Sequence, residues 1–117
     1  FRSDAPQVLA ACDVCILPAL KREGLPKAVI EGMVYGVTPI VTDSGGSPEL
    51  IEHGKSGLII PPGSSRAIAD AISQLYADRD RCARMGEEAR PRIQRDFHTS
   101  KTVEQTLSVY QELLLQK

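Results

Sequence analysis

The chain has 117 residues, of which 42% are hydrophobic and 25% charged, a balance typical of one soluble globular domain. Its 14 basic and 15 acidic residues give a net charge of −1, which offers no overall positive field to attract nucleic acid. No apolar run approaches the roughly 20 residues that a membrane-spanning helix needs.

The first expected element is a short helix over residues 6–12, capped by Asp4 and with a proline in its first turn. The continuous apolar run Val14–Leu17 ends at Pro18 and predicts a strand buried on both faces. The chain opens without methionine, and we expect it to be a piece of a longer protein.

A second helix is expected to start near Pro26, a plausible first helical position, and to stop at Gly36. Residues 37–41 predict the second strand. Ser47 is expected to cap a short third helix, in which Glu49 places a favourable negative charge in the first turn.

Residues 57–60 predict a third strand, and 65–77 an amphipathic helix. The arginine-rich pattern of 80–95 is also helical, but Pro91 is expected to break or kink it. A last helix starts near Thr99. Its apolar face is formed by Val103, Leu107, Tyr110 and Leu114.

This alternation of strands and helices predicts an α/β fold with a parallel sheet. Three strands are few for such a sheet, and we expect residues preceding Phe1 to provide further surface for the closing helices to cover.

The three cysteines leave two interpretations open. Cys12 and Cys15 have a C-x-x-C spacing, which can indicate a redox or metal-binding pair. No second pair and no nearby histidine completes a zinc set, so we favour reduced, buried thiols for these two and for Cys82.

Two predicted loops follow the carboxyl ends of neighbouring strands, where α/β sheets bind ligands. One contains Glu23 and Gly24, and the other contains Asp43, Ser44, Gly45 and Gly46. We expect both loops to open onto the same edge of the sheet.

Two glutamates with seven residues between them flank the start of the second helix, whose free N–H groups can bind an anion. Pro26 has no N–H, so Lys27 and Ala28 are the expected donors. Glu31 suits a ribose diol and Glu23 a sugar hydroxyl, which together predict a nucleotide-sugar site.

Each of these features also has a plainer explanation. Glu31 alone would be a solvated helix charge, and Gly45-Gly46 alone a turn. His53 and His98 have no partner pattern and are interpreted as structural or surface residues. Only the joint placement of the loops favours a site.

Several motifs in order resemble the C-terminal, donor-binding domain of GT-B-fold retaining glycosyltransferases, known as glycosyl transferases group 1. They are Glu23-Gly24-Leu25-Pro26, Glu31-Gly32-Met33, residues 36–41, Gly45-Gly46-Ser47-Pro48-Glu49 and Gly54-Lys55-Ser56-Gly57-Leu58. The resemblance implies a Rossmann-like parallel sheet flanked by helices. Residues 1–117 would be part of that domain, without the N-terminal domain.

The resemblance also implies site residues. In that family the first glutamate of the E-x7-E motif contacts the donor sugar and the second binds the ribose, so Glu23 is the expected catalytic residue. The expected donor-binding residues are Glu23, Gly24, Leu25, Pro26, Lys27 and Glu31, with Gly45 and Gly46 in a phosphate- or sugar-facing loop. Leu25-Pro26 departs from the family's commoner Phe-Gly.

The implied activity is hexosyl transfer, with retention, from a nucleotide sugar to a glycan or lipid-linked acceptor bound by the missing N-terminal domain. No cofactor or essential metal is expected, and no nucleic acid. The implied location is cytoplasmic, and this is compatible with peripheral association of the full protein with the cytoplasmic face of a membrane. A non-catalytic binding or assembly module is the alternative, and a GT-B epimerase would require catalytic residues outside this chain.

Overall fold

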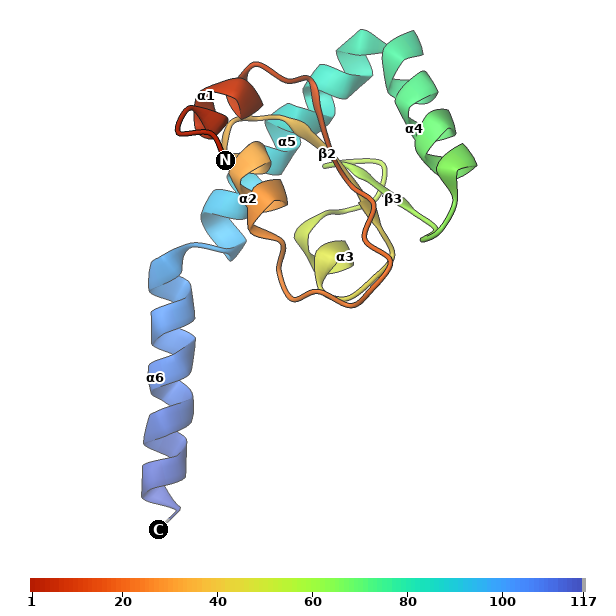
Figure 1. The fold of residues 1–117 in the computed structure, drawn as a ribbon. Helices are drawn as coiled ribbons and strands as arrows, with labels where there is room; N and C mark the ends of the chain where they lie inside the picture. Colours follow the sequence, from red (N-terminus) through yellow and green to blue (C-terminus); the bar gives the residue numbers. More distant parts are fainter. Residues whose placement is uncertain (117) are drawn as a thin grey trace.

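The computed structural model describes residues 1–116, in which short strands alternate with helices (Figure 1). The strands are β1 (Val14–Leu17), β2 (Thr38–Thr42) and β3 (Leu58–Ile60). The helices are α1 (Ala5–Ala10), α2 (Lys27–Val34), α3 (Ser47–Leu50), α4 (Ser65–Ala77), α5 (Arg79–Asp96) and α6 (Thr99–Leu115).

The three strands form a parallel sheet in the order β1-β2-β3, which confirms the predicted α/β fold. Ile16 pairs with Ile40, and Ile40 pairs with Leu58. Parallel neighbours require crossover helices, and α2 and α3 lie in the two crossovers. All carboxyl ends of the strands therefore meet at one edge of the sheet.

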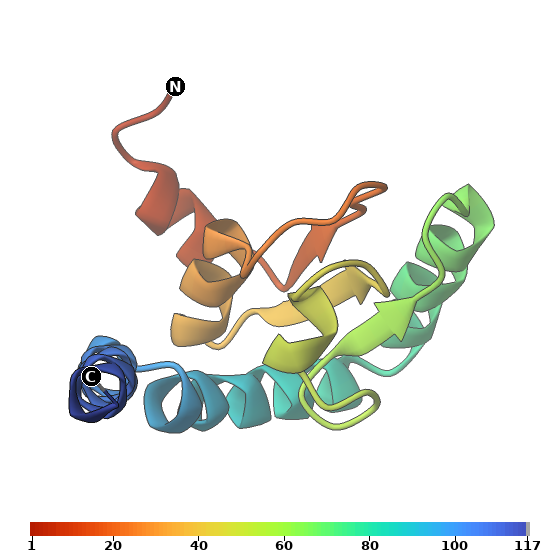
Figure 2. The same cartoon turned by 90° about the horizontal axis from the view of Figure 1, so that it is seen from below.

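The core lies on both faces of the sheet, because side chains alternate along each strand. Val41 packs on the side of α2 and α3, whereas Ile40 packs on the side of α4. Helix α5 runs beneath the strands and packs into the core on both faces (Figure 2). Its residue Ala89 belongs to the same cluster as Val41, and Met85 belongs to the same cluster as Ile40.

Strand β1 has the predicted bounds but is half-buried, so the prediction that both of its faces are buried is wrong. In the described part of the chain it is an edge strand, paired only with β2. The second and third strands each begin one residue later than predicted, at Thr38 and Leu58.

Two predicted helix caps differ from the structure. Asp4 is the capping residue of α1, as predicted, but its carboxylate accepts hydrogen bonds from Arg2, at 2.8 and 2.7 Å, and makes no capping bond. Ser47 lies in the first turn of α3, after Gly46 as the capping residue. Its buried hydroxyl has no hydrogen-bond partner among residues 1–116.

Pro91 does not break α5, which continues to Asp96. A proline removes the N–H that would bond to the carbonyl four residues earlier, here Glu87. Both residues are exposed, so water can reach that carbonyl. Buried Ala89 and Ile93, on the opposite side, hold the helix against the sheet.

The cysteines differ in burial. Cys12 is exposed, so the prediction that it is buried is wrong; Cys15 is half-buried and Cys82 buried. All three are free thiols. Burial raises the pKa of the Cys15 thiol. No group of three or more His, Cys, Asp or Glu side chains in residues 1–116 is arranged to hold a metal ion.

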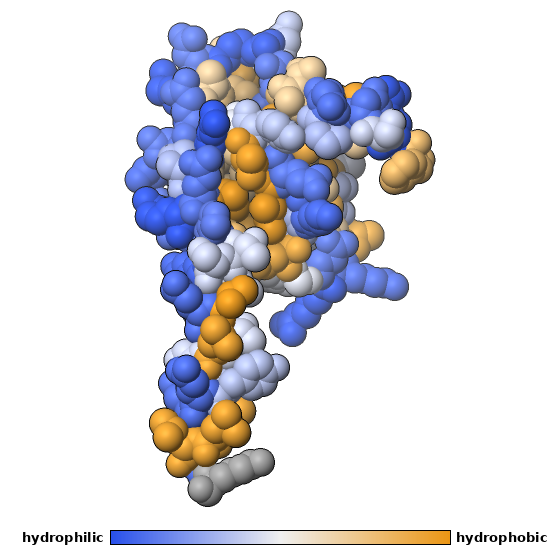
Figure 3. All heavy atoms as spheres, turned by 90° about the vertical axis from the view of Figure 1, so that its left-hand side faces the viewer, coloured by the Kyte–Doolittle hydropathy of each residue, from blue (hydrophilic) through white to orange (hydrophobic). Residues whose placement is uncertain are grey.

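Helix α6 extends away from the rest of the molecule (Figure 1). Its predicted apolar residues are exposed: Val103, Leu107, Tyr110 and Leu114. Figure 3 shows hydrophobic side chains gathered along this projecting helix and on the neighbouring face of the body. None of the described helices is long and apolar enough to cross a membrane.

Candidate functional site

The loop that follows β1 and the loop that follows β2 run together at the carboxyl edge of the sheet, as predicted (Figure 1 and Figure 2). Three hydrogen bonds join them along their length. Thr42 Oγ1 donates to the Ala19 carbonyl at 2.7 Å, Ser44 Oγ to that of Lys21 at 3.2 Å, and the Gly46 N–H to that of Glu23 at 3.0 Å.

The paired loops enclose an open, polar hollow of about 480 Å³. Its lining residues are Arg22, Glu23, Asp43, Ser44, Gly45, Gly46 and Glu49. The structure thus brings together Glu23, Gly45 and Gly46 from two loops, as the sequence predicts. It adds Arg22, a cation whose only sequence signal is its position beside Glu23.

Gly45 and Gly46 allow the close approach of the two loops. Gly45 has φ +60°, and a Cβ at this position would overlap the Glu23 carbonyl oxygen. A Cβ on Gly46 would lie 3.0 Å from the Gly24 carbonyl oxygen. The glycine pair therefore forms a turn, as in the plainer interpretation. It also lies in close contact with the backbone of the Glu23 loop.

The start of α2 opens onto the same edge. Pro26 is the capping residue rather than the first helical residue, and its side chain caps nothing. The first N–H bonded within the helix is that of Ile30, to the Pro26 carbonyl. The N–H groups of Lys27 and Ala28, both exposed, therefore have no acceptor inside α2 and can bind an anion.

Glu31 lies one turn beyond Lys27, and its side chain is 47% exposed. Its carboxylate is 3.9 Å from the Lys27 ammonium, a solvated pair that contributes little to stability. Glu31 is not among the lining residues of the polar hollow. The two glutamates thus flank the helix start, with Glu23 in the hollow and Glu31 on the helix beyond it.

The other predicted donor-binding residues belong to the short stretch between the hollow and α2. Leu25 is half-exposed, and a Cβ on Gly46 would lie 3.4 Å from its Cδ2 atom, so Leu25 packs against the second loop. Pro26 is buried, whereas Gly24 is exposed with open space around its Cα. A ligand can therefore approach the backbone at Gly24.

Helix α3 is held from α5 by Arg92, whose side chain binds its last carbonyls. Arg92 Nε donates to Leu50 at 2.8 Å and Nη2 to Glu49 at 3.1 Å. These bonds satisfy carbonyls that the helix end leaves free. Sequence reasoning missed this contact, because nothing distinguishes Arg92 from the other arginines of α5.

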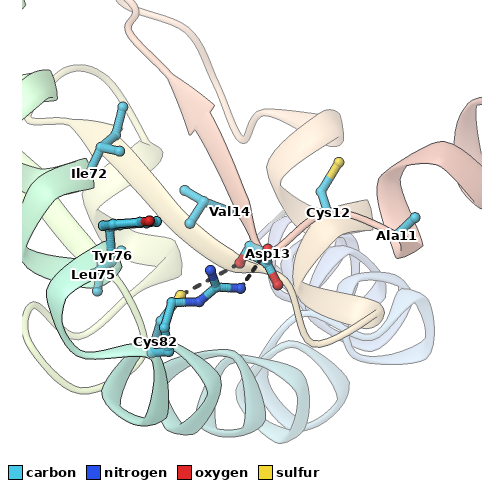
Figure 4. A pocket seen from close by; sticks show the side chains of 9 residues that line it. Ala11, Cys12, Asp13, Val14, Ile72, Leu75, Tyr76 and Cys82 are labelled. Atoms are coloured by element: carbon cyan, nitrogen blue, oxygen red, sulfur yellow. Dashed lines mark hydrogen bonds and ion pairs between the residues drawn. The ribbon is translucent and has the colours of Figure 1, made fainter.

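A second hollow, of about 340 Å³, lies at the amino end of β1, away from the paired loops (Figure 4). Its lining is mostly apolar and comes from β1, α4 and α5: for example Val14, Leu75 and Tyr76. The Asp13 carboxylate beside it pairs with Arg79 at 3.2 Å. Besides apolar surface and this ion pair, the free thiols of Cys12 and Cys82 line the hollow.

A family model described as Glycosyl transferases group 1 matches residues 1–92. The N-acetyl-alpha-D-glucosaminyl L-malate synthase of Bacillus anthracis is 32% identical over 113 residues, 97% of this chain and 29% of the relative. A GDP-mannose-dependent alpha-(1-6)-phosphatidylinositol monomannoside mannosyltransferase of Mycobacterium tuberculosis is 37% identical over 93 residues, 74% of this chain and 24% of the relative.

Several solved structures are also similar to this chain. HepE of Anabaena, in complex with UDP, has a TM-score of 0.83 and 30% identity, over 93% of this chain and 31% of HepE. It has also been solved with UDP-glucose. A glycosyltransferase of Rickettsia africae has a TM-score of 0.88 at 24% identity, over 97% of this chain and 30% of its own, and supports the fold. The chain spans less than a third of the length of each of these proteins.

Proposed function

The chain belongs to the glycosyl transferases group 1 family, and we propose that it forms part of the C-terminal, donor-binding domain of a retaining glycosyltransferase. The transferase activity belongs to the longer enzyme, because the relatives are more than three times as long as the match. The observation that carries the proposal is the pairing of the Glu23 loop with Gly45-Gly46 beside the open start of α2.

The donor is a nucleotide sugar whose parts lie along this edge. The diphosphate oxygens accept hydrogen bonds from the N–H groups of Lys27 and Ala28. At this helix start, the helix dipole and the Lys27 ammonium stabilise negative charge. Glu31 accepts hydrogen bonds from the ribose diol. Glu23 accepts from a sugar hydroxyl, and the backbone at Gly24, Leu25 and Pro26 adjoins sugar and diphosphate.

In the transfer step the bond between the sugar C1 atom and the diphosphate oxygen breaks, and the nucleoside diphosphate leaves with the bonding electrons. The acceptor hydroxyl oxygen bonds to C1, and its proton passes to the leaving diphosphate. This chain stabilises the charge that develops on the leaving diphosphate and orients the sugar. The proposal requires no metal or cofactor.

Two neighbours support a nucleotide-sugar donor. HepE has been solved with UDP and UDP-glucose, and the mycobacterial relative is named for GDP-mannose. The acceptor, a glycan or lipid-linked sugar, would be bound by the part of the enzyme outside this chain, which would also provide any peripheral membrane contact. A cytoplasmic location suits the three free cysteines.

The test is a transferase assay on the full-length enzyme with UDP-glucose and GDP-mannose as first donors. We expect donor-dependent formation of a glycosylated product, with the anomeric configuration of the donor retained in its NMR spectrum. An enzyme that binds the nucleotide but releases no sugar from any donor would instead support the non-catalytic module.

The 117-residue chain alone is expected to transfer no sugar, because in this proposal the acceptor is bound by the part of the enzyme outside it. The measurement is product formation by the purified chain beside the full-length enzyme at equal concentration. Measurable turnover by the isolated chain would contradict this division of labour.

A further inference from the structure

Strand β2 carries two buried threonines that make the same kind of bond at opposite ends. Thr38 is 1% exposed and its hydroxyl donates to the Cys82 carbonyl of α5 at 2.6 Å. Thr42 is 2% exposed and its hydroxyl donates to the Ala19 carbonyl at 2.7 Å. Thr38 lies at the amino end of the strand, and Thr42 lies at the carboxyl end, beside the donor site.

The Thr42 bond begins a ladder that continues the association of β1 with β2 beyond their last paired residues. The last paired residues are Leu17 and Val41. Beyond this pair, alternate residues of the second loop donate hydrogen bonds to the carbonyl oxygens of alternate residues of the first loop. The donors are Thr42, Ser44 and Gly46, and the acceptors are Ala19, Lys21 and Glu23.

Side-chain hydroxyls serve in this ladder because the backbone donors of the second loop are used elsewhere. The Asp43 N–H bonds to the Ile60 carbonyl at 2.8 Å, and the Ser44 N–H bonds to the Thr42 carbonyl at 2.8 Å. Besides the ladder, the first loop is held by Leu25, which is 46% exposed and packs against the second loop, whereas Leu20 is 73% exposed. The ladder supplies the hydrogen bonds that join the two loops, and Thr42 is its buried first step.

We propose that Thr42 is a positioning residue for the transfer reaction: its hydroxyl fixes the loop that presents Glu23 to the donor sugar. This rests on the proposed function. Thr42 itself does not line the polar hollow. A loop freed at Ala19 lets Glu23 move relative to the reacting sugar, and a displacement of about 1 Å can lower a rate on the order of a hundredfold. The start of α2, which takes the diphosphate, is anchored separately by buried Val29 and Met33.

The test compares four variants with the wild type in the full-length enzyme: Thr42→Val, Thr42→Ser, Thr42→Ala and Thr38→Val. Thr42→Val is expected to lower kcat about tenfold or more, with the Kd of the free nucleoside diphosphate changed less than about twofold. Thr42→Ser keeps the hydroxyl and should restore the rate. Thr38→Val removes an equally buried hydroxyl from the same strand and should leave kcat unchanged at a temperature where it is folded.

Equal kcat values for Thr42→Val and Thr38→Val, or no recovery in Thr42→Ser, would overturn the proposal while leaving the proposed function intact. If Thr42→Val does not fold, Thr42→Ala decides, because it differs from Thr42→Ser only in lacking the hydroxyl that bonds to the Ala19 carbonyl. A lowered kcat supports the proposal, and an unchanged kcat overturns it. A wild-type enzyme that transfers no sugar would overturn the proposed function, and this proposal with it.

Discussion

Replacement of Glu31 by alanine in the full-length enzyme is expected to raise the Kd for its nucleotide-sugar donor about ten- to a hundredfold. Hydrogen bonds to a charged group contribute about 1.5–3 kcal/mol, and about 1.4 kcal/mol is a factor of ten in Kd. Glu31 is half-exposed and its pairing with Lys27 is solvated, so its loss should leave the fold intact. The measurement is isothermal titration calorimetry.

The matched control is Glu52→Ala. Glu52 is exposed, and its carboxylate also lies 3.9 Å from a lysine ammonium, that of Lys55, but away from the paired loops. The Glu52→Ala variant loses one negative charge and one surface ion pair with a lysine, as Glu31→Ala does. Its donor Kd should match the wild type. A Glu31→Ala enzyme with wild-type donor affinity would remove Glu31 from the site.

Replacement of Gly45 by alanine is expected to lower kcat by about a hundredfold and to destabilise the fold by about 1–3 kcal/mol. The residue has φ +60°, which disfavours any side chain, and its Cβ would overlap the Glu23 carbonyl oxygen. The two loops must separate to admit the methyl group, and Glu23 moves with them. Steady-state kinetics and denaturant unfolding measure the two effects.

Gly54→Ala separates strain from displacement. Gly54 has φ +82°, and no atom lies within 4 Å of the position that a Cβ would take, so alanine there meets the same backbone penalty without a collision. It should lose about 1 kcal/mol of stability and keep the wild-type kcat. If both variants retained full activity, the close contact between Gly45 and Glu23 would be irrelevant to transfer.

The elements that sequence predicted best are those with a strong local pattern. The amphipathic pattern of residues 65–77 gives the observed bounds of α4, and the apolar run before Pro18 gives those of β1. The meeting of the two loops also follows from sequence, because the carboxyl ends of parallel strands share an edge.

What sequence reasoning missed depends on partners far away in the chain. The burial of β1 was overestimated because an apolar run does not reveal how many neighbours a strand has. Asp4 is a good cap by type, but a nearby arginine competes for it. The bond from Thr42 to Ala19 and that from Arg92 to Leu50 join residues 23 and 42 positions apart, and no local pattern encodes them.

Helix α6 keeps an exposed apolar surface. Val103, Leu107 and Leu114 on α6 are exposed in a chain that spans less than a third of its relatives. The proposed site is also partial: the Glu23 loop and α2 supply two carboxylates and a helix start, and we propose that the acceptor is bound outside this chain.

The central claim is that the donor lies along the edge formed by the Glu23 loop, Gly45-Gly46 and the start of α2. A crystal structure of the full-length enzyme with the nucleotide sugar that it turns over tests this most directly. The claim predicts diphosphate oxygens within about 3.2 Å of the N–H of Lys27 or Ala28, and ribose hydroxyls within the same distance of the Glu31 carboxylate. A donor bound with both contacts absent, for example in the apolar hollow beside Tyr76, would contradict it.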